Sequence, residues 1–218
     1  MSADVDCLHA DDTLLVLRKP SGLLCVPGRG PTKQDALSAR AQALWPDALI
    51  VHRLDQPTSG LVLMARGMQM QRALGHAFAE RRVHKRYQAV VAGRLQAPPG
   101  SGADGWSEIS LPIAADWERR PLRVIDTARG QPSLTRWRVL AHNPVDDSTR
   151  VELEPVTGRT HQLRVHLAAL GHPILGDMLY GDAAAQARAP RLLLHACGLG
   201  FAHPLRGDWC SYMSEPPF

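Results

Sequence analysis

Short apolar runs separated by proline- and glycine-containing turns limit most strongly what this chain can fold into. Runs of this length with alternating polarity predict β-strands, and they recur through residues 106–155 without a regular alternation of strand and helix. Residues 68–82 and 160–170 instead carry apolar side chains at helical spacing. This mixture predicts an α+β fold: a mixed, mostly antiparallel β-sheet with flanking helices.

The same patterns predict where individual elements begin and end. Residues 13–28 indicate two short strands broken by the turn Lys19-Pro20-Ser21-Gly22. Asp35 is a candidate N-cap for the helix that follows it, and Thr160 for the last long helix. Gly171 is placed to adopt the left-handed conformation beyond the end of that last helix.

Length and composition favour one domain. With 218 residues, 44% of them hydrophobic and 21% charged, residues 1–218 fit a single globular domain with a sizeable core. No stretch approaches the roughly 18 consecutive apolar residues of a membrane helix. The first residues, MSADVDCLHADD, are acidic where a secretion signal would be basic and then apolar. We therefore expect a cytoplasmic protein with no membrane partner.

The basic residues suggest a polyanionic partner. Lys and Arg number 25 against 21 Asp and Glu, which gives a net charge of +4. The excess of arginine suits phosphate binding, although it could equally reflect the composition of the genome. The distribution is more informative, because basic residues gather in two stretches of the chain, at positions 81, 82, 85, 86 and 94 and at positions 119, 120, 123, 129, 136 and 138.

Neither a metal nor a nucleotide cofactor is indicated. Four scattered cysteines form no CxxC pair, which favours reduced thiols over a disulfide or a zinc site: Cys7, Cys25, Cys197 and Cys210. His161 and His166 are five residues apart, about 140° around a helix, so they do not share a face. Hydrogen-bonded scaffold histidines are the expected alternative. The sequence also contains no phosphate-binding loop and no GxGxxG after a strand.

One acidic residue stands out by its position. Asp55 lies in a short polar loop between two apolar runs, with Arg53 before it and Thr58-Ser59-Gly60 after it. A carboxylate in such a place loses water and needs a cation or a hydrogen-bond donor, or its pKa rises. A structural role, in which Asp55 ties the turn through backbone hydrogen bonds, is the alternative that this segment leaves open.

The segment HRLDQPTSGLVLMA (residues 52–65) resembles the catalytic signature of the RluA family of pseudouridine synthases. Two further blocks match in the same order, KRYQAVVAG (85–93) and PVTGRTHQLRVHLAALGHPILGDMLYG (155–181). KPSGLLCVPG (19–28) and RLLLHA (191–196) also agree. Several separated blocks in order along most of the chain make the resemblance highly specific.

The resemblance implies a cofactor-free isomerase with the pseudouridine synthase catalytic fold and a central RNA-binding cleft. Asp55 would be the essential carboxylate, acting at C1′, at the uracil or on a 2′ proton. Tyr87 would stack on the uracil and handle a proton, and its alternative is a half-buried strand tyrosine. Arg164 would pair with Asp55 and hold it ionised, since a guanidinium grips a carboxylate through two hydrogen bonds; a solvated helix arginine is the alternative.

RNA binding involves further residues. The target nucleotide must leave its stack, and by resemblance Arg53 would displace or replace it. Leu163 would contact the base, although its spacing equally suits the core. Other basic residues would hold backbone phosphates: Arg81, Arg82, Lys85, Arg86, Arg119, Arg120 and Arg123.

The blocks begin at Lys19, which leaves no room for the N-terminal S4-type domain that many members of the family carry. The chain is most similar to short members that modify both 23S ribosomal RNA and the tRNA anticodon loop. We therefore expect those RNAs as substrates and a monomeric enzyme. The alternatives are a catalytically silent RNA-binding or ribosome-assembly module and a metal-dependent hydrolase.

Overall fold

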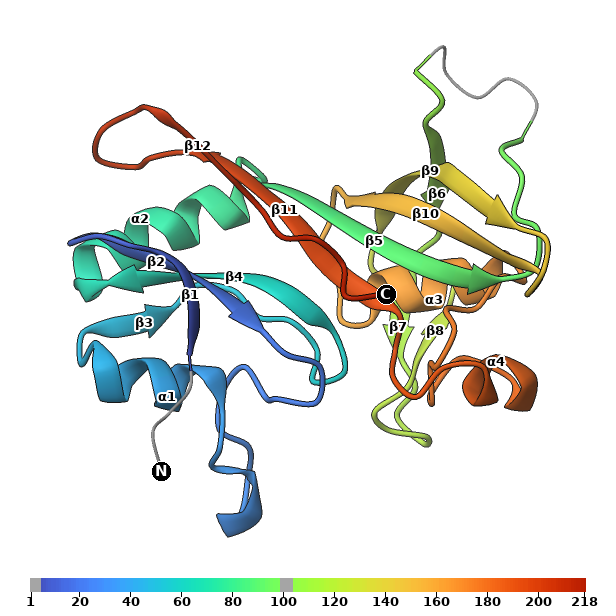
Figure 1. The fold of residues 1–218 in the computed structure, drawn as a ribbon, viewed down its shortest axis with the longest axis horizontal. Helices are drawn as coiled ribbons and strands as arrows, with labels where there is room; N and C mark the ends of the chain where they lie inside the picture. Colours follow the sequence, from blue (N-terminus) through green and yellow to red (C-terminus); the bar gives the residue numbers. More distant parts are fainter. Residues whose placement is uncertain (1–4, 99–103) are drawn as a thin grey trace. The chain divides into compact units, whose positions relative to one another are not determined.

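The computed structural model describes residues 5–98 and 104–218, which form two compact units (Figure 1). The first unit is built from the chain up to Lys85 together with His195–Pro217. The second is built from Arg86–Leu194 and Phe218. The first unit therefore combines the two ends of the chain, and the second is almost entirely its middle.

In the first unit, four strands are hydrogen-bonded in the order β1 (Asp6–Ala10), β2 (Leu14–Lys19), β4 (Ser59–Arg66) and β11 (Leu194–Ala202). β3 (Ala48–Ile50) also pairs with β4, and β12 (Trp209–Met213) with β11. β4 and β11 run parallel, and the other pairs run antiparallel. The helical elements are the short η1 (Pro31–Lys33), α1 (Leu37–Leu44) and α2 (Gly67–Ala79).

The core of this unit forms between α2 and the apolar side chains of β2 and β4. β4 is buried along nearly its whole length, as expected for a strand that reads as a continuous apolar run. α2 buries Met70, Leu74 and Ala77, which lie on one face at helical spacing. Leu61, Leu63 and the buried Phe201 of β11 complete the cluster.

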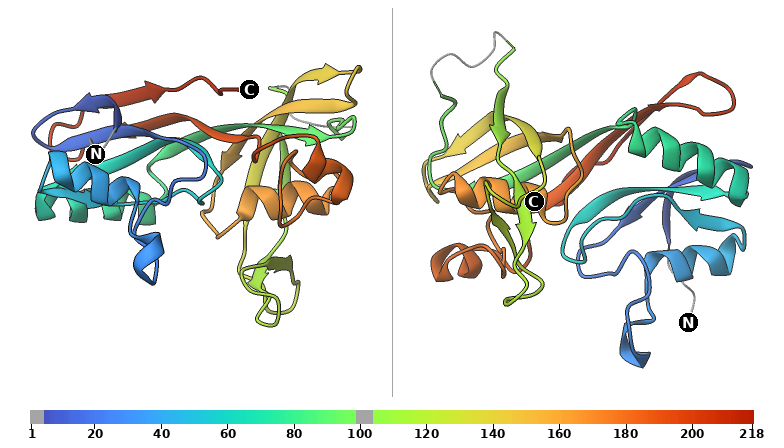
Figure 2. Two further views of the ribbon diagram at one scale, coloured as in Figure 1. Left: turned by 60° about the horizontal axis from the view of Figure 1, so that its bottom comes forward. Right: turned by 180° about the vertical axis from the view of Figure 1, so that it is seen from behind.

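In the second unit, the strands pair antiparallel in the order β5 (His84–Ala92), β10 (Ser148–Pro155), β9 (Leu134–Asn143) and β6 (Ser107–Ser110). β7 (Ile113–Ala115) and β8 (Arg123–Ile125) form a separate two-stranded sheet. α3 (Gln162–Ala169) lies against β9 and β10 (Figure 2), and the short α4 (Ala183–Ala187) follows it.

The predicted α+β class with a mixed, mostly antiparallel sheet is confirmed. α2, α3, β9 and β10 all lie within or close to the segments that predicted them. Gly171 follows α3 with φ of 81°, in the left-handed region, as predicted. No helix among the described residues is long and apolar enough to cross a membrane. All four cysteines are free thiols.

Three local predictions were wrong. The second strand before residue 28 is absent, and Leu24 forms only an isolated bridge to Ala36. Asp35 does not cap α1, because its carboxylate forms a salt bridge with Arg40 and Ala36 occupies the N-cap without a side-chain hydrogen bond.

Thr160 does not cap α3 either. The N-cap is His161, which adopts the left-handed conformation at φ of 58°. Its ring hydrogen-bonds the Tyr180 hydroxyl, Nδ1 to oxygen at 2.6 Å. This contact, with a residue 19 positions away, fixes the start of the helix.

Candidate active site

Asp55 lies in the first unit, in the loop between β3 and β4, and its residue is half-buried. The Thr58 amide donates to the Asp55 carbonyl at 3.1 Å, which closes a turn just before β4. Arg53, two residues earlier, is exposed. The predicted carboxylate is therefore carried by a short turn just before β4, a strand that is buried along nearly its whole length.

A buried lysine holds this turn in place. The Lys19 residue is 1% exposed at the end of β2, and its ammonium donates to the carbonyls of Pro20, Leu23 and Gln56 at 2.9, 2.7 and 2.9 Å. A buried ammonium is stable only with such acceptors, because losing water costs several kcal/mol. The contact with Gln56 joins the KPSG segment to the residue next to Asp55.

Three further hydrogen bonds join the same two segments. The Gly22 amide donates to the Gln56 carbonyl at 2.9 Å, and the Gln56 side chain returns a bond to the Gly22 carbonyl at 2.9 Å. The Ser21 hydroxyl donates to the Pro57 carbonyl at 2.7 Å. These bonds explain why the KPSG segment forms a turn.

The other side of Asp55 is held by a thiol. The Leu54 amide donates to the Cys25 sulfur at 3.2 Å, and both residues are buried. Burial raises the pKa of the Cys25 thiol, so it stays protonated and neutral. Sequence reasoning did not single out Cys25, because a lone cysteine carries no spacing signal.

His52 fixes the chain just before Arg53. Its Nε2 accepts a hydrogen bond from the Leu63 amide of β4 at 2.9 Å, and its ring stacks on Phe78 of α2 with centroids 4.6 Å apart. Burial, together with the charge of Lys85, lowers the pKa of His52 to about 3. A neutral imidazole with an unprotonated Nε2 is what the Leu63 bond requires.

The start of β4 is fixed by close packing against β11. Gly60 has φ of 115°, and a Cβ there would lie 2.3 Å from the Ala196 carbonyl oxygen. Next to it, the Ser59 hydroxyl bonds His195 Nδ1 at 2.8 Å, and His195 Nε2 bonds the Ser214 hydroxyl at 3.1 Å. The TSG and LHA blocks thus meet as paired strands.

Arg164 lies in the second unit, on α3, and its side chain is 3% exposed. Its Nε and Nη2 donate to the two carboxylate oxygens of Asp177 at 2.8 and 2.6 Å, and Asp177 is fully buried. The guanidinium also lies over the ring of Tyr180, 5.0 Å from its centroid. The solvated-helix alternative for Arg164 is therefore wrong.

Asp177 was not predicted as a site residue, although it stands in the matched block ILGDMLYG. Besides Arg164, it accepts hydrogen bonds from the amides of Leu179 and Tyr180 at 2.9 and 3.2 Å. Its distance from Arg164 along the chain hid the pairing from pattern analysis. Together these bonds hold the guanidinium in one orientation.

Tyr87 and Leu163 also belong to the second unit. Tyr87 is half-buried on β5, paired across from Leu153, and it packs against the apolar core of the unit. Leu163 is 7% exposed and belongs to that core. Its predicted contact with the target base stays a prediction.

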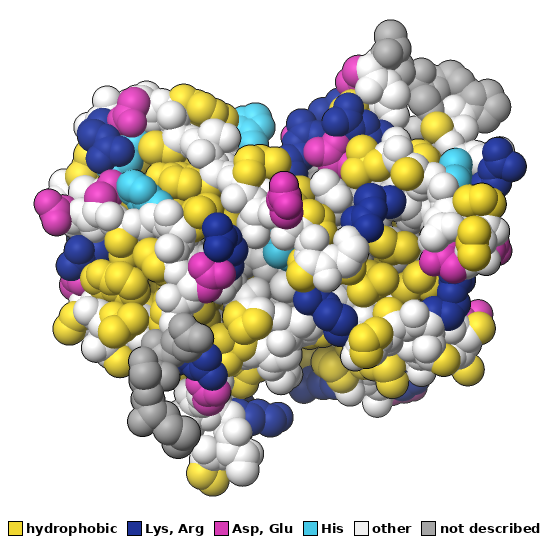
Figure 3. Space-filling view, in the orientation of Figure 1, with side chains coloured by type: hydrophobic (Ala, Val, Ile, Leu, Met, Phe, Trp, Pro, Cys, Tyr) yellow, Lys and Arg dark blue, Asp and Glu magenta, His cyan; other side chains and the backbone are white. Residues whose placement is uncertain are grey.

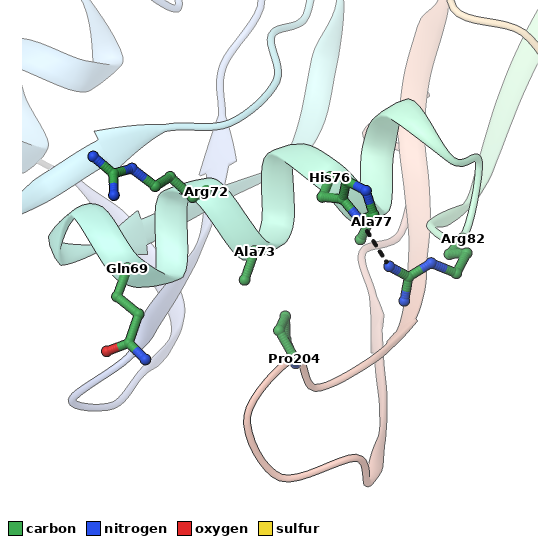
Figure 4. Close-up of a pocket in the computed structure, with 7 residues that line it drawn as sticks. All are labelled: Gln69, Arg72, Ala73, His76, Ala77, Arg82 and Pro204. Atoms are coloured by element: carbon green, nitrogen blue, oxygen red, sulfur yellow. Dashed lines mark hydrogen bonds between the residues drawn. The ribbon is translucent and has the colours of Figure 1, made fainter.

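Arg81 and Arg82 follow the end of α2 and are exposed. Arg82 donates to Glu80 at 2.6 Å and lies 3.4 Å from His76. Arg82 lines one end of a groove of about 530 Å³ between α2 and the loop that carries Pro204 (Figure 4). Half-buried Lys85 is the second residue of β5.

Arg86 sits in a charged cluster on β5, β9 and β10 of the second unit. It lies 3.6 Å from Glu152 and 3.7 Å from Glu154, and its guanidinium is 4.6 Å from the centroid of Trp106. Arg136 and Arg138 pair with the same acids and contact the same ring. Figure 3 shows basic and acidic side chains close together on the visible face of each unit.

The remaining predicted basic residues lie on or beside the β7–β8 hairpin. Arg119 pairs with Asp116 at 2.7 Å. The Arg120 guanidinium lies 4.0 Å from the ring centroid of exposed Trp117. Arg123 is half-buried on β8.

The two helix histidines serve the scaffold. His166 is fully buried between the Thr135 hydroxyl at 2.9 Å and the Leu111 carbonyl at 3.0 Å, and burial lowers its pKa. His161 bonds Tyr180, as described above. Hydrogen bonding thus accounts for both rings.

Comparison with known proteins decides the family. The family model described as RNA pseudouridylate synthase matches residues 13–169, which include Asp55, Tyr87 and Arg164. The chain belongs to the RNA pseudouridylate synthase family. The matched range begins just before the KPSG turn and ends with α3, so it contains the KPSG segment and the Asp55 turn that it holds.

Similar proteins agree along nearly the whole chain. A "Dual-specificity RNA pseudouridine synthase RluA" of Pasteurella multocida is 45% identical over 98% of this chain and 94% of its own length. The protein of the same name from Escherichia coli K12 is 43% identical over 97% and 93%. The solved structure of human RNA Pseudouridylate Synthase Domain Containing 1 superposes with a TM-score of 0.82, at 30% identity over 100% of this chain and 86% of that one.

Proposed function

We propose that this protein isomerises uridine to pseudouridine in RNA, with Asp55 as the essential carboxylate. The observation that carries the proposal is the family match across residues 13–169, joined to the way the fold holds the Asp55 turn. Lys19 and Cys25 fix the backbone on either side of Asp55. Such anchoring suits a group that must meet its substrate in one geometry.

The reaction breaks the bond between C1′ and N1 of uridine and forms a bond between C1′ and C5. The base turns between these steps, N1 gains a proton, and C5 loses one, so no cofactor or net redox change is needed. Asp55 acts at C1′, at the uracil or on a 2′ proton, and each route needs an ionised carboxylate beside the glycosidic bond.

Arg164 is proposed to keep Asp55 ionised. Asp177 engages Nε and one terminal nitrogen of the guanidinium. A guanidinium carries five N–H donors, so it can serve a second carboxylate while Asp177 fixes its plane. Tyr87 would stack on the extruded uracil and handle the proton that leaves C5.

Substrate binding needs a nucleotide that has left its stack. Arg53, exposed beside the Asp55 turn, would occupy the vacated space, and Leu163 would contact the base. The other predicted basic residues would hold phosphates. We propose uridines in 23S ribosomal RNA and in the tRNA anticodon loop as targets, and a cytoplasmic monomer in which the two units work as one catalytic domain.

The test uses purified protein, without added metal or cofactor, and two unmodified transcripts: an anticodon stem-loop and a 23S fragment. Chemical mapping should reveal pseudouridine at defined positions in both. Sequencing of RNA from cells with and without the protein names the natural sites. Binding without product would support the silent RNA-binding module, and RNA hydrolysis that a chelator abolishes would support the hydrolase class.

A further inference from the structure

A second groove, in the second unit, is built for an anion. It encloses about 530 Å³ beside the β7–β8 hairpin and the turn before α3. Three arginines line it, and no Asp or Glu is among the described residues that do so. The lining residues are Ile113, Ala114, Ala115, Trp117, Arg123, Arg129, Gln131, Gly158, Arg159 and Thr160.

Arg123 carries an unsatisfied donor at this groove. Its Nε is buried and has no hydrogen-bond partner, the single such side-chain atom within residues 5–98 and 104–218. A buried donor without a partner costs about 1–3 kcal/mol, so natural structures rarely leave one without a reason. The Arg123 side chain lines the groove, so an oxyanion bound there would lie beside this incompletely satisfied guanidinium.

The other two arginines of the groove each use their Nε in a hydrogen bond within the protein. Arg129 uses its Nε for Asp126 at 3.0 Å, and its side chain is 87% exposed. Arg159 uses its Nε for the Pro132 carbonyl at 3.3 Å. In both residues the bond to Nε fixes the side chain, and the terminal nitrogens are the part of the fork that matches a phosphate.

Trp117 adds a flat surface to the rim. The Trp117 residue is 70% exposed, and one side of its ring carries Arg120. Exposed indole beside arginine is a combination that stacks on unpaired bases, worth about 1–3 kcal/mol per base. A phosphate next to an unpaired base is the chemistry of a single RNA strand.

Within the same unit, hydrogen bonds connect residues of the groove to Tyr180, which contacts the predicted catalytic residue Arg164. The Arg123 amide donates to the Tyr180 hydroxyl at 3.0 Å, and the Tyr180 ring lies under the Arg164 guanidinium. His161 bonds the same hydroxyl and is the residue after Thr160 of the groove. A ligand at Arg123 would therefore sit on the scaffold that orients Arg164.

We propose that this groove binds one phosphodiester of an unpaired RNA segment, through Arg123, Arg129 and Arg159, with the adjoining base on Trp117. The inference rests on the proposed function and names a second contact for the same RNA substrate. It adds Arg159, which the sequence had not marked as RNA-binding, to Arg123 and Arg129 of the basic stretch.

The test measures binding of the anticodon stem-loop transcript at several salt concentrations. R123Q and R159Q should each weaken binding about tenfold and lower the slope of log K against log salt by about one. W117A should weaken binding without changing that slope. The matched control is R18Q, because Arg18 is an exposed arginine paired with Asp6 on β1 of the first unit. R18Q should change the RNA affinity and the salt slope less than R123Q and R159Q do.

A phosphate scan locates the contact. Single methylphosphonates along the loop should weaken wild-type binding at one position and have no effect there on R159Q. R123K, which keeps the charge but loses the fork, guards against a folding defect and should lie between wild type and R123Q. Equal effects of R18Q and R159Q, or an unchanged salt slope, would overturn the groove.

Rates separate this inference from the proposed function. At enzyme concentrations below saturation, R159Q should form product more slowly than R18Q, because less of the RNA is bound. Wild-type protein that binds through the groove but makes no pseudouridine would overturn the proposed function and leave the groove standing.

Discussion

The ammonium of Lys19 donates to the carbonyl of Gln56 at 2.9 Å, one residue beyond Asp55. A side chain that normally belongs to the surface is here completely buried, and all three of its protons meet backbone oxygens. The position of the proposed catalytic carboxylate is thus set by a cation that never touches the substrate in this account.

Replacing Lys19 by methionine should therefore destabilise the protein. The substitution keeps the volume but removes the buried ammonium that the Pro20, Leu23 and Gln56 carbonyls share, and Gln56 then keeps only its bond from the Gly22 amide. We expect a loss of about 3 kcal/mol in the free energy of unfolding. K33M, at an exposed lysine of η1, is the matched control. Urea unfolding measures both, and equal stability of K19M and K33M would contradict the anchoring role.

The buried pair Arg164–Asp177 gives a second prediction. Removing one partner leaves an isolated buried charge, so R164M should cost about 3–5 kcal/mol in unfolding free energy. Adding D177L should recover part of this loss, because no charge then remains unpaired. Thermal or urea unfolding of the single and double variants measures the coupling. Strictly additive losses would show that the pair is not a unit.

His52 predicts a pH dependence. Its pKa is about 3 in the folded protein and near 6.5 when unfolded, so the unfolded chain binds more protons between those values. The free energy of unfolding should therefore fall as the pH drops from about 6.5 toward 3. H52Q keeps an acceptor for the Leu63 amide but does not titrate. Its unfolding free energy should fall less over this range, and a slope identical to wild type would refute the assignment.

Gly60 should tolerate no side chain. At G60A the new Cβ meets the Ala196 backbone, and φ of 115° adds strain, so we expect little folded protein. G75A is the control, because a Cβ at Gly75 of α2 meets nothing within 4 Å. That variant should gain about 0.5–1 kcal/mol. Circular dichroism melts compare the two, and a normal melt for G60A would contradict the close packing.

Long apolar runs explain what the sequence could predict. β4 and α2 follow from the periodicity of their own side chains, whose burial is a local property of the pattern. Polar residues with distant partners were the failures. Asp35 and Thr160 have the side chains of helix caps, but Asp35 forms a salt bridge with Arg40 instead. At α3, the N-cap is His161, which bonds Tyr180, and not Thr160.

The site residues also fall into those that the sequence pattern indicates and those that only the folded structure shows. Asp55 stood out because it interrupts two apolar runs, and the motif blocks added Tyr87 and Arg164. Lys19, Cys25 and Asp177 support them through contacts that no local spacing encodes, since burial and hydrogen bonding join segments 13 to 37 residues apart. Such supporting residues become visible only once the chain is folded.

Asp55 carries the proposed chemistry. D55N preserves shape and removes the negative charge, so pseudouridine formation under single-turnover conditions should drop by about 10⁴-fold or more, with RNA affinity and stability retained. D12N, at an exposed aspartate of the same unit, should keep the wild-type rate. Pseudouridine formed by D55N at the rate of D12N would contradict the central claim.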